Sequence, residues 1–235
     1  MCTVTFLPLK DNNFILTSNR DETPLRKTVA PKTYLENGVE LTYPKDELAG
    51  GTWIGISNKK RLVCLLNGAF INHSRSKYYK TSRGIIVKKV LSADDAVTYI
   101  NKFDFIGIEP FTLILVEYLG QIATYELVWD GVLKHFTKLA QEPKIWSSST
   151  LYSEDIKQAR KDWFANWMLE NEDYQQEKIL AFHQNENLGN EETSPKIKRA
   201  FIETVSITSV KKENDKVEIT YLDFLKDVVK TLKLK

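Results

Sequence analysis

Two short stretches near the N-terminus hold residues that could do covalent chemistry together. Cys2 follows the initiating methionine, and Asn19-Arg20-Asp21-Glu22 ends the next apolar run. Removal of Met1 would give Cys2 a free α-amine beside its thiol, and an amine that titrates at about pH 8 can serve as the base for its own nucleophile. The alternative is structural: Cys2 is a small apolar residue in a strand, and residues 19–22 form a polar turn.

An antiparallel hairpin would bring Cys2 and Arg20 together. Residues 2–7 alternate, Asp11-Asn12-Asn13 supplies turn residues, and residues 14–17 run back. A turn centred near Asp11 makes paired positions sum to about 22, so Cys2 faces Arg20. The cation would lower the pKa of the thiol, and Asp21 could hold the ammonium or guanidinium group.

A second hairpin offers a group that could stabilise an oxyanion. Residues 52–56 and 61–66 flank a turn at residues 58–60, which brings Gly50-Gly51 beside Asn67-Gly68. The Asn67 amide could donate a hydrogen bond to a developing oxyanion. Trp53 either lines a pocket, with Gly51 allowing close backbone approach, or belongs to the core.

The remaining chain predicts hairpins and helices in alternating blocks. Hairpins with helix pairs favour antiparallel sheets covered by helices over βαβ units. We expect helices at 82–89, 92–103 (with Ser92 as N-cap), 153–170, 176–184 and 222–234, a loop at 185–195, and hairpins at 111–129 and 204–221.

Composition narrows the class of protein. The chain of 235 residues is 42% hydrophobic and 27% charged, which suits one domain spanning residues 1–235. A net charge of +2 predicts no strong general attraction to nucleic acid or to a membrane. No apolar stretch is long enough to span a membrane, and no signal-peptide pattern or nucleotide-binding loop is visible.

The two cysteines give no disulfide framework, so we expect a cytoplasmic protein. Cys64 lies in an apolar run, and we expect it in the core.

One basic stretch leaves two interpretations open. Residues 72–83 carry Arg75, Lys77, Lys80 and Arg83 around two tyrosines. The stretch could clamp an anionic substrate or form a solvated loop. The histidines at positions 73, 135 and 183 are scattered and suggest no metal or haem ligand set.

The motifs as a set resemble those of the NRDE family, also called the transport and Golgi organisation protein 2 family. The resemblance rests on Cys2, NRDE at 19–22, AGGTWIG at 49–55, LLNGA at 65–69, SRG at 82–84 and WSSSTLY at 146–152. It implies an α+β fold like that of N-terminal-nucleophile hydrolases: a four-layer αββα sandwich of two stacked antiparallel sheets flanked by helices.

The same resemblance implies roles for individual residues. Cys2 would be the nucleophile, Arg20 and Asp21 its partners and Asn67 the oxyanion donor. Beside these roles, our own candidates for substrate contact are Gly51, Trp53, Arg83 and Ser148. Ser147-Ser148-Ser149 stands where related acylases carry another polar residue, and their late arginine has no clear match near Ser206.

Two functions follow from the resemblance. The first is a hydrolase that needs no cofactor and cleaves an amide or thioester acyl bond of a small molecule through Cys2. The second is a binding or trafficking protein for haem, acyl-CoA or lipid on the same scaffold. The sequence leaves the substrate and the oligomeric state open.

Overall fold

The computed structural model describes residues 3–234, and their contacts divide the chain into two compact units. Unit 1 combines the N-terminal segment up to Arg26 with residues 142–235. Unit 2 is continuous and comprises residues 27–141. Within the described residues, no helix is long and apolar enough to cross a membrane.

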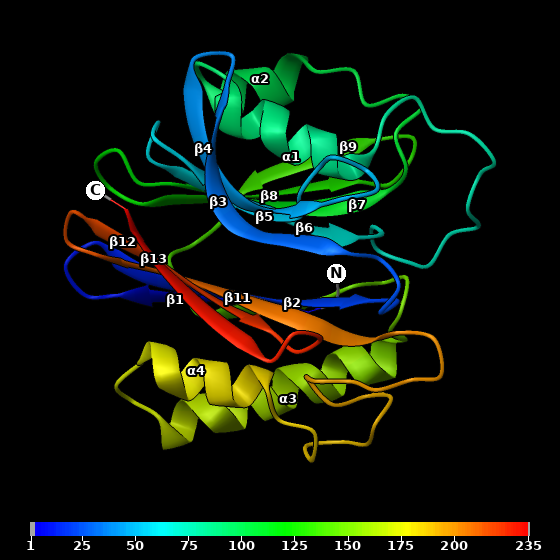
Figure 1. Ribbon diagram of the computed structural model, residues 1–235, viewed down its shortest axis with the longest axis vertical. Coiled ribbons are helices and arrows are strands. Elements are labelled where there is room, and N and C mark those ends of the chain that lie inside the picture. Colours follow the sequence, from blue (N-terminus) through cyan, green and yellow to red (C-terminus); the bar gives the residue numbers. More distant parts are fainter. Residues whose placement is uncertain (1–2, 235) are drawn as a thin grey trace. The chain divides into compact units, whose positions relative to one another are not determined.

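Unit 1 is built on an antiparallel sheet of six strands with the order β10-β1-β2-β11-β12-β13. Helices α3 and α4 lie along one face of this sheet (Figure 1). The elements are β1 (Thr3–Leu9), β2 (Asn13–Glu22), β10 (Lys144–Ser147), α3 (Glu154–Glu170), α4 (Gln176–His183), β11 (Glu203–Glu213), β12 (Lys216–Asp223) and β13 (Val228–Leu234).

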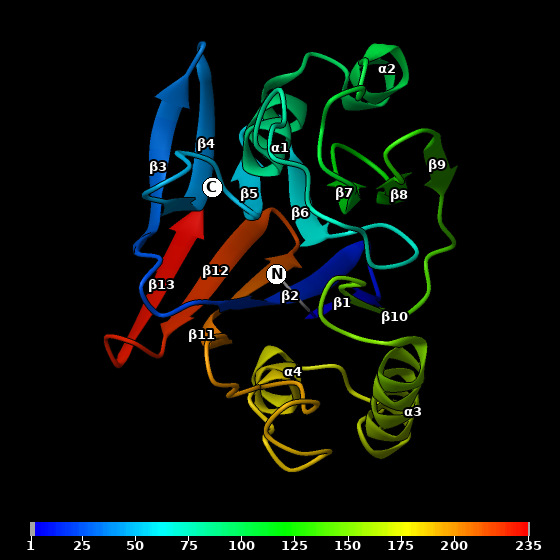
Figure 2. The same cartoon turned by 90° about the vertical axis from the view of Figure 1, so that its right-hand side faces the viewer.

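Unit 2 is built on an antiparallel sheet of seven strands in sequence order, β3 to β9. Helices α1 and α2 cover one of its faces (Figure 2). The elements are β3 (Thr28–Glu36), β4 (Val39–Asp46), β5 (Ile54–Ser57), β6 (Arg61–Asn67), α1 (Arg83–Ser92), α2 (Ala96–Lys102), β7 (Phe111–Glu117), β8 (Ala123–Trp129) and β9 (Lys134–Lys138).

Each unit has an apolar cluster under its helices. In unit 2 this cluster is broad and includes Val87 and Val90 of α1 with Leu113 and Leu115 of β7. In unit 1 it is smaller and consists of Leu7, Ile15, Ile145, Phe164, Ile179 and Phe182. Cys64 is fully buried in β6, as the sequence predicts.

The C-terminal segment corrects one prediction, because residues 222–234 form no helix. β12 continues to Asp223, whose Oδ1 accepts hydrogen bonds from the backbone N–H groups of Leu225 and Lys226. This turn sends the chain back as β13, and Leu232 and Leu234 pair with Ile219 and Val217. Leu232 and Leu234 are two residues apart, which is the spacing of one face of a strand, and this spacing indicates a strand here instead of a helix.

A second correction concerns where α2 begins. Ser92 is the last residue of α1, where its Oγ donates to the Lys88 carbonyl at 2.9 Å. The N-cap of α2 is Asp95, whose Oδ1 accepts the Thr98 N–H. A carboxylate at this position satisfies a backbone donor that the first turn of a helix leaves open.

Candidate active site

The β1–β2 hairpin has the register that the sequence predicts. Thr3 pairs with Asn19, Val4 with Ser18 and Phe6 with Leu16, so paired positions sum to 22 throughout Thr3–Leu9. Asp11 and Asn12 make the turn with φ values of 56° and 59°, a region that Asn and Asp tolerate better than most residues. Cys2 lies outside the described residues. The first described residue of β1 therefore enters the sheet opposite Asn19, directly before Arg20 and Asp21 in β2.

The Asp21 carboxylate is held by two hydroxyl groups from distant parts of unit 1. Tyr152 OH donates to Oδ2 at 2.9 Å, and Thr204 Oγ1 donates to Oδ1 at 2.6 Å. Thr204 reaches this position because β11 has a bulge between Thr204 and Ser206. Asp21 is 3% exposed. These hydrogen bonds fix the direction of both carboxylate oxygens.

Arg20 lies on the other face of β2, because adjacent strand residues point to opposite faces. Its guanidinium donates from Nη1 to the Arg26 carbonyl at 3.3 Å, and it is 3% exposed. Ser206 stands directly opposite Arg20 in β11. On this face the pKa of Tyr221 is raised to about 12, mainly by burial and also by the Asp223 charge, while Ser206 and the Arg20 charge oppose the rise. Arg20 thus places a buried positive charge on this face of the sheet.

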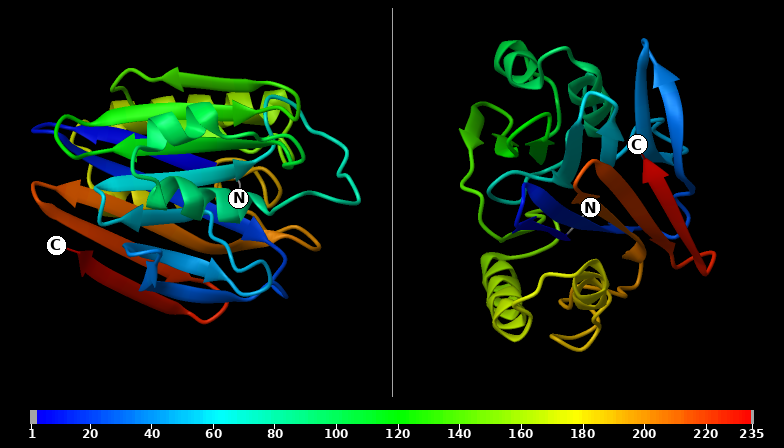
Figure 3. Two further views of the ribbon diagram at one scale, coloured as in Figure 1. Left: turned by 90° about the horizontal axis from the view of Figure 1, so that it is seen from above. Right: turned by 90° about the vertical axis from the view of Figure 1, so that its left-hand side faces the viewer.

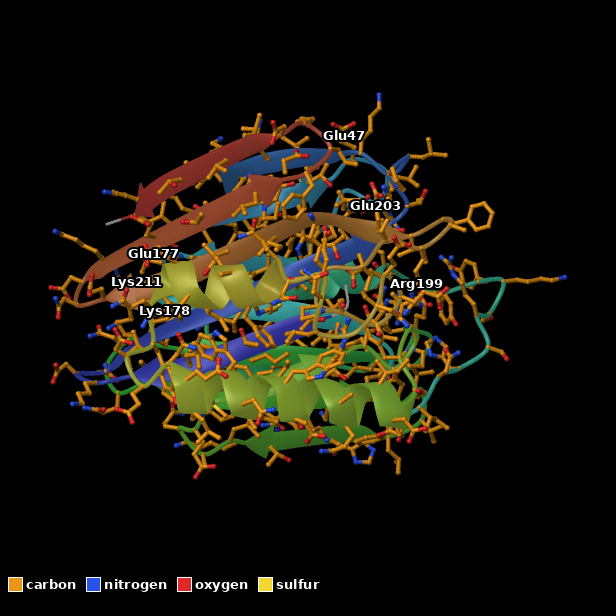
Figure 4. All side chains as sticks on the ribbon, turned by 90° about the horizontal axis from the view of Figure 1, so that it is seen from below. Glu47, Glu177, Lys178, Arg199, Glu203 and Lys211 are labelled. Atoms are coloured by element: carbon orange, nitrogen blue, oxygen red, sulfur yellow. The ribbon has the colours of Figure 1, made fainter. Side chains whose placement is uncertain are left out.

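Tyr152 is itself held by arginine side chains. The Arg160 guanidinium stacks on its ring at 3.7 Å, and the Arg199 guanidinium lies 5.2 Å from the ring centroid. Arg160 is fully buried in α3 and donates to Thr3 Oγ1, to the Ser194 carbonyl and, at 2.9 Å, to the Thr193 carbonyl. Arg199, labelled in Figure 4, belongs to the segment that follows α4 and precedes β11 in the sequence. Arg160 therefore connects the first described residue of β1 with the tyrosine that holds Asp21.

Asn19 anchors the same end of β2 to α4. Its Nδ2 donates to the carbonyls of His183, at 3.0 Å, and Pro195, at 2.7 Å. Its Oδ1 contacts His183 Nδ1 at 2.5 Å, and His183 Nε2 contacts Thr5 Oγ1 at 2.7 Å. Burial, with a smaller effect of the Arg160 charge, lowers the pKa of His183 to about 3. His183 is therefore neutral at physiological pH and acts as a structural connector, not as a base.

Ser148, predicted to contact substrate, lies in the tight turn after β10. It is 1% exposed, its Oγ lies 2.9 Å from Thr150 Oγ1, and its carbonyl accepts the Tyr152 N–H at 3.2 Å. The turn fixes the backbone of Tyr152. In the structure Ser148 thus supports the residue that holds Asp21.

The other predicted site residues belong to unit 2, where the β5–β6 hairpin places them at one end of the sheet. Asn67 ends β6 opposite Phe111 and is half-buried. The Trp53 carbonyl accepts the Leu65 N–H at 2.8 Å, and the Trp53 side chain is 4% exposed. The hydrogen bond between Trp53 and Leu65 is consistent with the predicted approach of residues 50–51 to the end of β6.

Gly51 makes a backbone contact that a side chain would block. A Cβ atom at Gly51 would lie 2.6 Å from the carbonyl carbon of Gly84 in α1. Thr52 N–H donates to the Gly84 carbonyl at 3.3 Å. The glycine therefore allows the start of α1 to pack against residues 51–52, and a substrate contact at Gly51 stays a prediction.

Arg83, the first residue of α1, faces an acidic side chain. Its Nη2 lies 3.2 Å from Glu109 Oε2, and its Nη1 donates to the Pro110 carbonyl at 3.0 Å. His73 Nε2 and Arg75 Nε approach the same carboxylate at 3.5 Å and 3.9 Å. An anionic substrate at Arg83 would compete with Glu109, and a substrate role for Arg83 stays a prediction.

Of the predicted site residues, Arg20, Asp21 and Ser148 belong to unit 1, with Arg20 and Asp21 on opposite faces of β2, and Gly51, Trp53, Asn67 and Arg83 belong to unit 2. Sequence reasoning missed Tyr152 and Thr204 as partners of Asp21, and Arg160 as the support for Tyr152. Tyr152 is the last residue of the WSSSTLY stretch, and its place in that motif was the one local indication that it belongs to the site. Across residues 3–234, no group of His, Cys, Asp and Glu side chains could hold a metal ion.

Solved structures with the same fold define the class of this scaffold. The Caenorhabditis elegans ortholog of N-acylethanolamine-hydrolyzing acid amidase is 14% identical, with a TM-score of 0.62 over 88% of this chain and 92% of that one. A variant of the conjugated bile acid hydrolase of Clostridium perfringens is 10% identical, with a TM-score of 0.53 over 100% and 97%. Penicillin V acylase of Agrobacterium tumefaciens is 9% identical, with a TM-score of 0.50 over 100% and 86%.

These likenesses show the N-terminal-nucleophile hydrolase fold, and they confirm the α+β, αββα class that the sequence predicts. The family model named Transport and Golgi organisation 2 matches residues 1–221. The chain belongs to this family, as its motifs indicate. The comparison with curated proteins gives no match.

Proposed function

We propose that the protein is an N-terminal-cysteine hydrolase that cleaves an amide or thioester acyl bond of a small molecule, with Cys2 as the nucleophile. The observation that carries the proposal is the Asp21 carboxylate, buried beside the start of β1 and oriented by Tyr152 and Thr204. Three proteins with the same fold are named as an amidase, a hydrolase and an acylase, which supports acyl chemistry here.

The proposed reaction uses the terminal amine that loss of Met1 would expose. The amine takes the thiol proton, and the thiolate attacks the acyl carbonyl carbon. The resulting oxyanion accepts a hydrogen bond from the Asn67 amide, and collapse of the intermediate expels the amine or thiol leaving group with that proton. Water then releases the acid from the acyl-cysteine and restores the thiol.

In this proposal Arg20 and Asp21 have separate tasks. Arg20 supplies a buried positive charge that lowers the pKa of the Cys2 thiol. Asp21 accepts a hydrogen bond from the terminal ammonium group and sets the direction of the amine. The opposite facing of these two side chains in β2 is consistent with two tasks, because one group serves the thiol and the other serves the amine.

Two measurements on the full chain test the proposal. Intact mass shows whether Met1 is removed, and the rate of iodoacetamide labelling against pH reports the pKa of the Cys2 thiol. We expect Cys2 to react faster at neutral pH than buried Cys64. Arg20→Ala should slow Cys2 labelling about ten-fold at pH 7, the effect of one pKa unit. Arg20→Lys should retain part of the effect, since it keeps the charge and loses the planar fork.

Cys2→Ala is the matched control, because it leaves Cys64 as the one thiol of the chain. Retention of Met1, or an ordinary Cys2 thiol that neither Arg20 substitution changes, would contradict the proposal. The scaffold would then be assigned to binding or trafficking of haem, acyl-CoA or lipid.

A further inference from the structure

One end of the unit 2 sheet carries a cluster of exposed apolar side chains. The loops that meet there are residues 68–82 after β6, residues 104–110 before β7 and residues 130–133 between β8 and β9. Asn67, Phe111, Trp129 and Lys134 are paired across neighbouring strands, so the three loops share this end of the sheet. We call their exposed apolar residues the apolar rim; they are Phe70, Ile71, Tyr78, Ile106, Val132 and Leu133.

The apolar rim is unusually exposed for side chains of this size. Ile71 is 75% exposed, Tyr78 81%, Ile106 70% and Val132 79%. Single exposed apolar residues are ordinary on a protein surface, whereas several large ones gathered in adjoining loops mark an interaction surface.

Positive charges accompany the apolar rim. Arg75, Lys77 and Lys80 are exposed and lie in the same loop as Phe70, Ile71 and Tyr78. The two neighbouring loops carry Asp104, Glu109 and Asp130; Arg75 Nε lies 3.9 Å from Glu109, and Asp130 pairs with His135. Residues 68–82 contain no aspartate or glutamate. The loop extends away from the sheet, so its tip meets a partner before the strands do (Figure 3). A projecting loop that mixes cations with aromatic and aliphatic side chains is complementary to a surface that is anionic outside and apolar beneath.

Contacts among the loops give the apolar rim a defined shape. The ring of Phe70 packs edge-on against His135 at 5.0 Å, and Lys80 N–H donates to the Gly107 carbonyl at 2.8 Å. Gly68 N–H donates to the Pro110 carbonyl at 3.1 Å, and Tyr79 OH accepts the Ser76 N–H at 2.8 Å. Ordering this surface at an interface therefore loses less conformational entropy than ordering a free chain would.

We propose that the apolar rim docks on the surface of an anionic lipid bilayer. Arg75, Lys77 and Lys80 contact the lipid phosphates and carboxylates, while Ile71, Tyr78 and Ile106 enter the boundary between headgroups and acyl chains. Each cation close to an anionic membrane surface strengthens binding about five-fold. The proposal goes beyond hydrolysis and does not depend on it, because Cys2 takes no part in docking.

Co-sedimentation with lipid vesicles tests the proposal on the full chain. We expect binding to phosphatidylcholine vesicles that contain phosphatidylserine, weaker binding at high salt, and little binding to pure phosphatidylcholine. Replacing Arg75, Lys77 and Lys80 by Ser should weaken binding roughly 100-fold, the product of three such factors. Ile71→Ser with Tyr78→Ser should weaken it further at high salt, where the apolar contribution remains.

Matched controls separate docking from general electrostatics. Replacing the exposed Lys138, Lys161 and Lys216 by Ser lowers the net charge equally outside the three loops, and Leu119→Ser removes an apolar residue, 82% exposed, in the β7–β8 turn. Both controls should bind like the parent. The proposal would be overturned if the parent did not bind anionic vesicles. It would also be overturned if replacing Lys138, Lys161 and Lys216 weakened binding as much as replacing Arg75, Lys77 and Lys80. Because Cys2→Ala should still bind, failure here is distinguishable from failure of the proposed hydrolase.

Discussion

Each sheet carries a pair of helices on one face, but the side chains buried between the sheet and its helices differ in polarity. In unit 2 these side chains are apolar and include Leu65 of β6, Leu113 of β7 and Ile100 of α2. In unit 1 the apolar cluster around Ile15 and Phe164 gives way, toward the end of β2, to the buried Asn19, Arg160 and His183.

The difference shows two ways of stabilising the same arrangement of elements. Apolar burial is non-directional, so it tolerates substitutions that keep volume. A buried polar network stabilises only while each donor and acceptor has its partner, and it fixes side-chain directions in return. Unit 1 has the directional interior where Asp21 is held, and this favours a positioning role for the network.

The largest expected effect comes from removing the cation at the centre of this network. Arg160→Met should lower the free energy of unfolding by about 3 kcal/mol, because Thr3 Oγ1 and the Thr193 and Ser194 carbonyls lose a buried charged donor. In unit 2, Leu113→Met keeps volume and should lower it by less than about 1.5 kcal/mol. Urea titration followed by circular dichroism measures both.

Arg160→Lys refines this test, since lysine keeps the charge and loses the planar arrangement of donors. We expect a stability between those of the parent and Arg160→Met. Equal losses for Arg160→Met and Leu113→Met would contradict the distinction between the two interiors.

The second effect is a dependence of stability on pH that arises in unit 1. The pKa of His183 is lowered to about 3 in the folded chain from 6.5 in the unfolded one, so the unfolded chain binds a proton first as pH falls. The stabilisation is therefore complete above pH 6.5 and declines below it, by about 1.4 kcal/mol per pH unit. Between pH 6.5 and 5 the parent should lose about 2 kcal/mol relative to His183→Gln. Parallel stability profiles for the two proteins would exclude this origin.

The smallest effect concerns the hydroxyl groups that hold Asp21. Tyr152→Phe and Thr204→Val each remove one hydrogen bond to a buried carboxylate, so each should lower stability by about 1.5 kcal/mol. If Asp21 orients the terminal amine, both variants should also change the pH profile of Cys2 alkylation. Tyr118→Phe, which removes a buried tyrosine hydroxyl in unit 2, is the control for stability alone. Unchanged alkylation in Tyr152→Phe and Thr204→Val would leave the hydroxyls with a structural role only.

The sequence predicts well those parts of the fold that are set by local turns. The β1–β2 register follows from the turn at Asp11 and Asn12, and the turns at Gly120 and Asn214 adopt the positive φ values that their residue types favour. Four other strands were not identified from the sequence. β3 and β4 are joined by an Asn37-Gly38 turn, whose positive φ values suit a tight hairpin, but they contain Pro31 and Pro44, residues that ordinarily argue against a strand. β9 and β10 are short.

The environment of Asp21 could not be predicted for a different reason. Tyr152 and Thr204 lie 131 and 183 residues from Asp21, and the sequence has no periodicity that connects them. The bulge in β11 that brings Thr204 into place is equally invisible without the structure. Arg20 and Asp21 were identified because they are adjacent, whereas their partners depend on tertiary packing.

The division of unit 1 into two segments has a consequence for how the chain is synthesised. The β1–β2 hairpin leaves the ribosome early, but β10 and β11, the strands that flank it in the sheet, follow only after residues 27–141. At ordinary rates of translation this interval is on the order of ten seconds. Throughout that time Thr3 lacks its later partners, Ser147 of β10 and Arg160 of α3. Unit 2, whose strands pair in order of synthesis, can fold during the same interval.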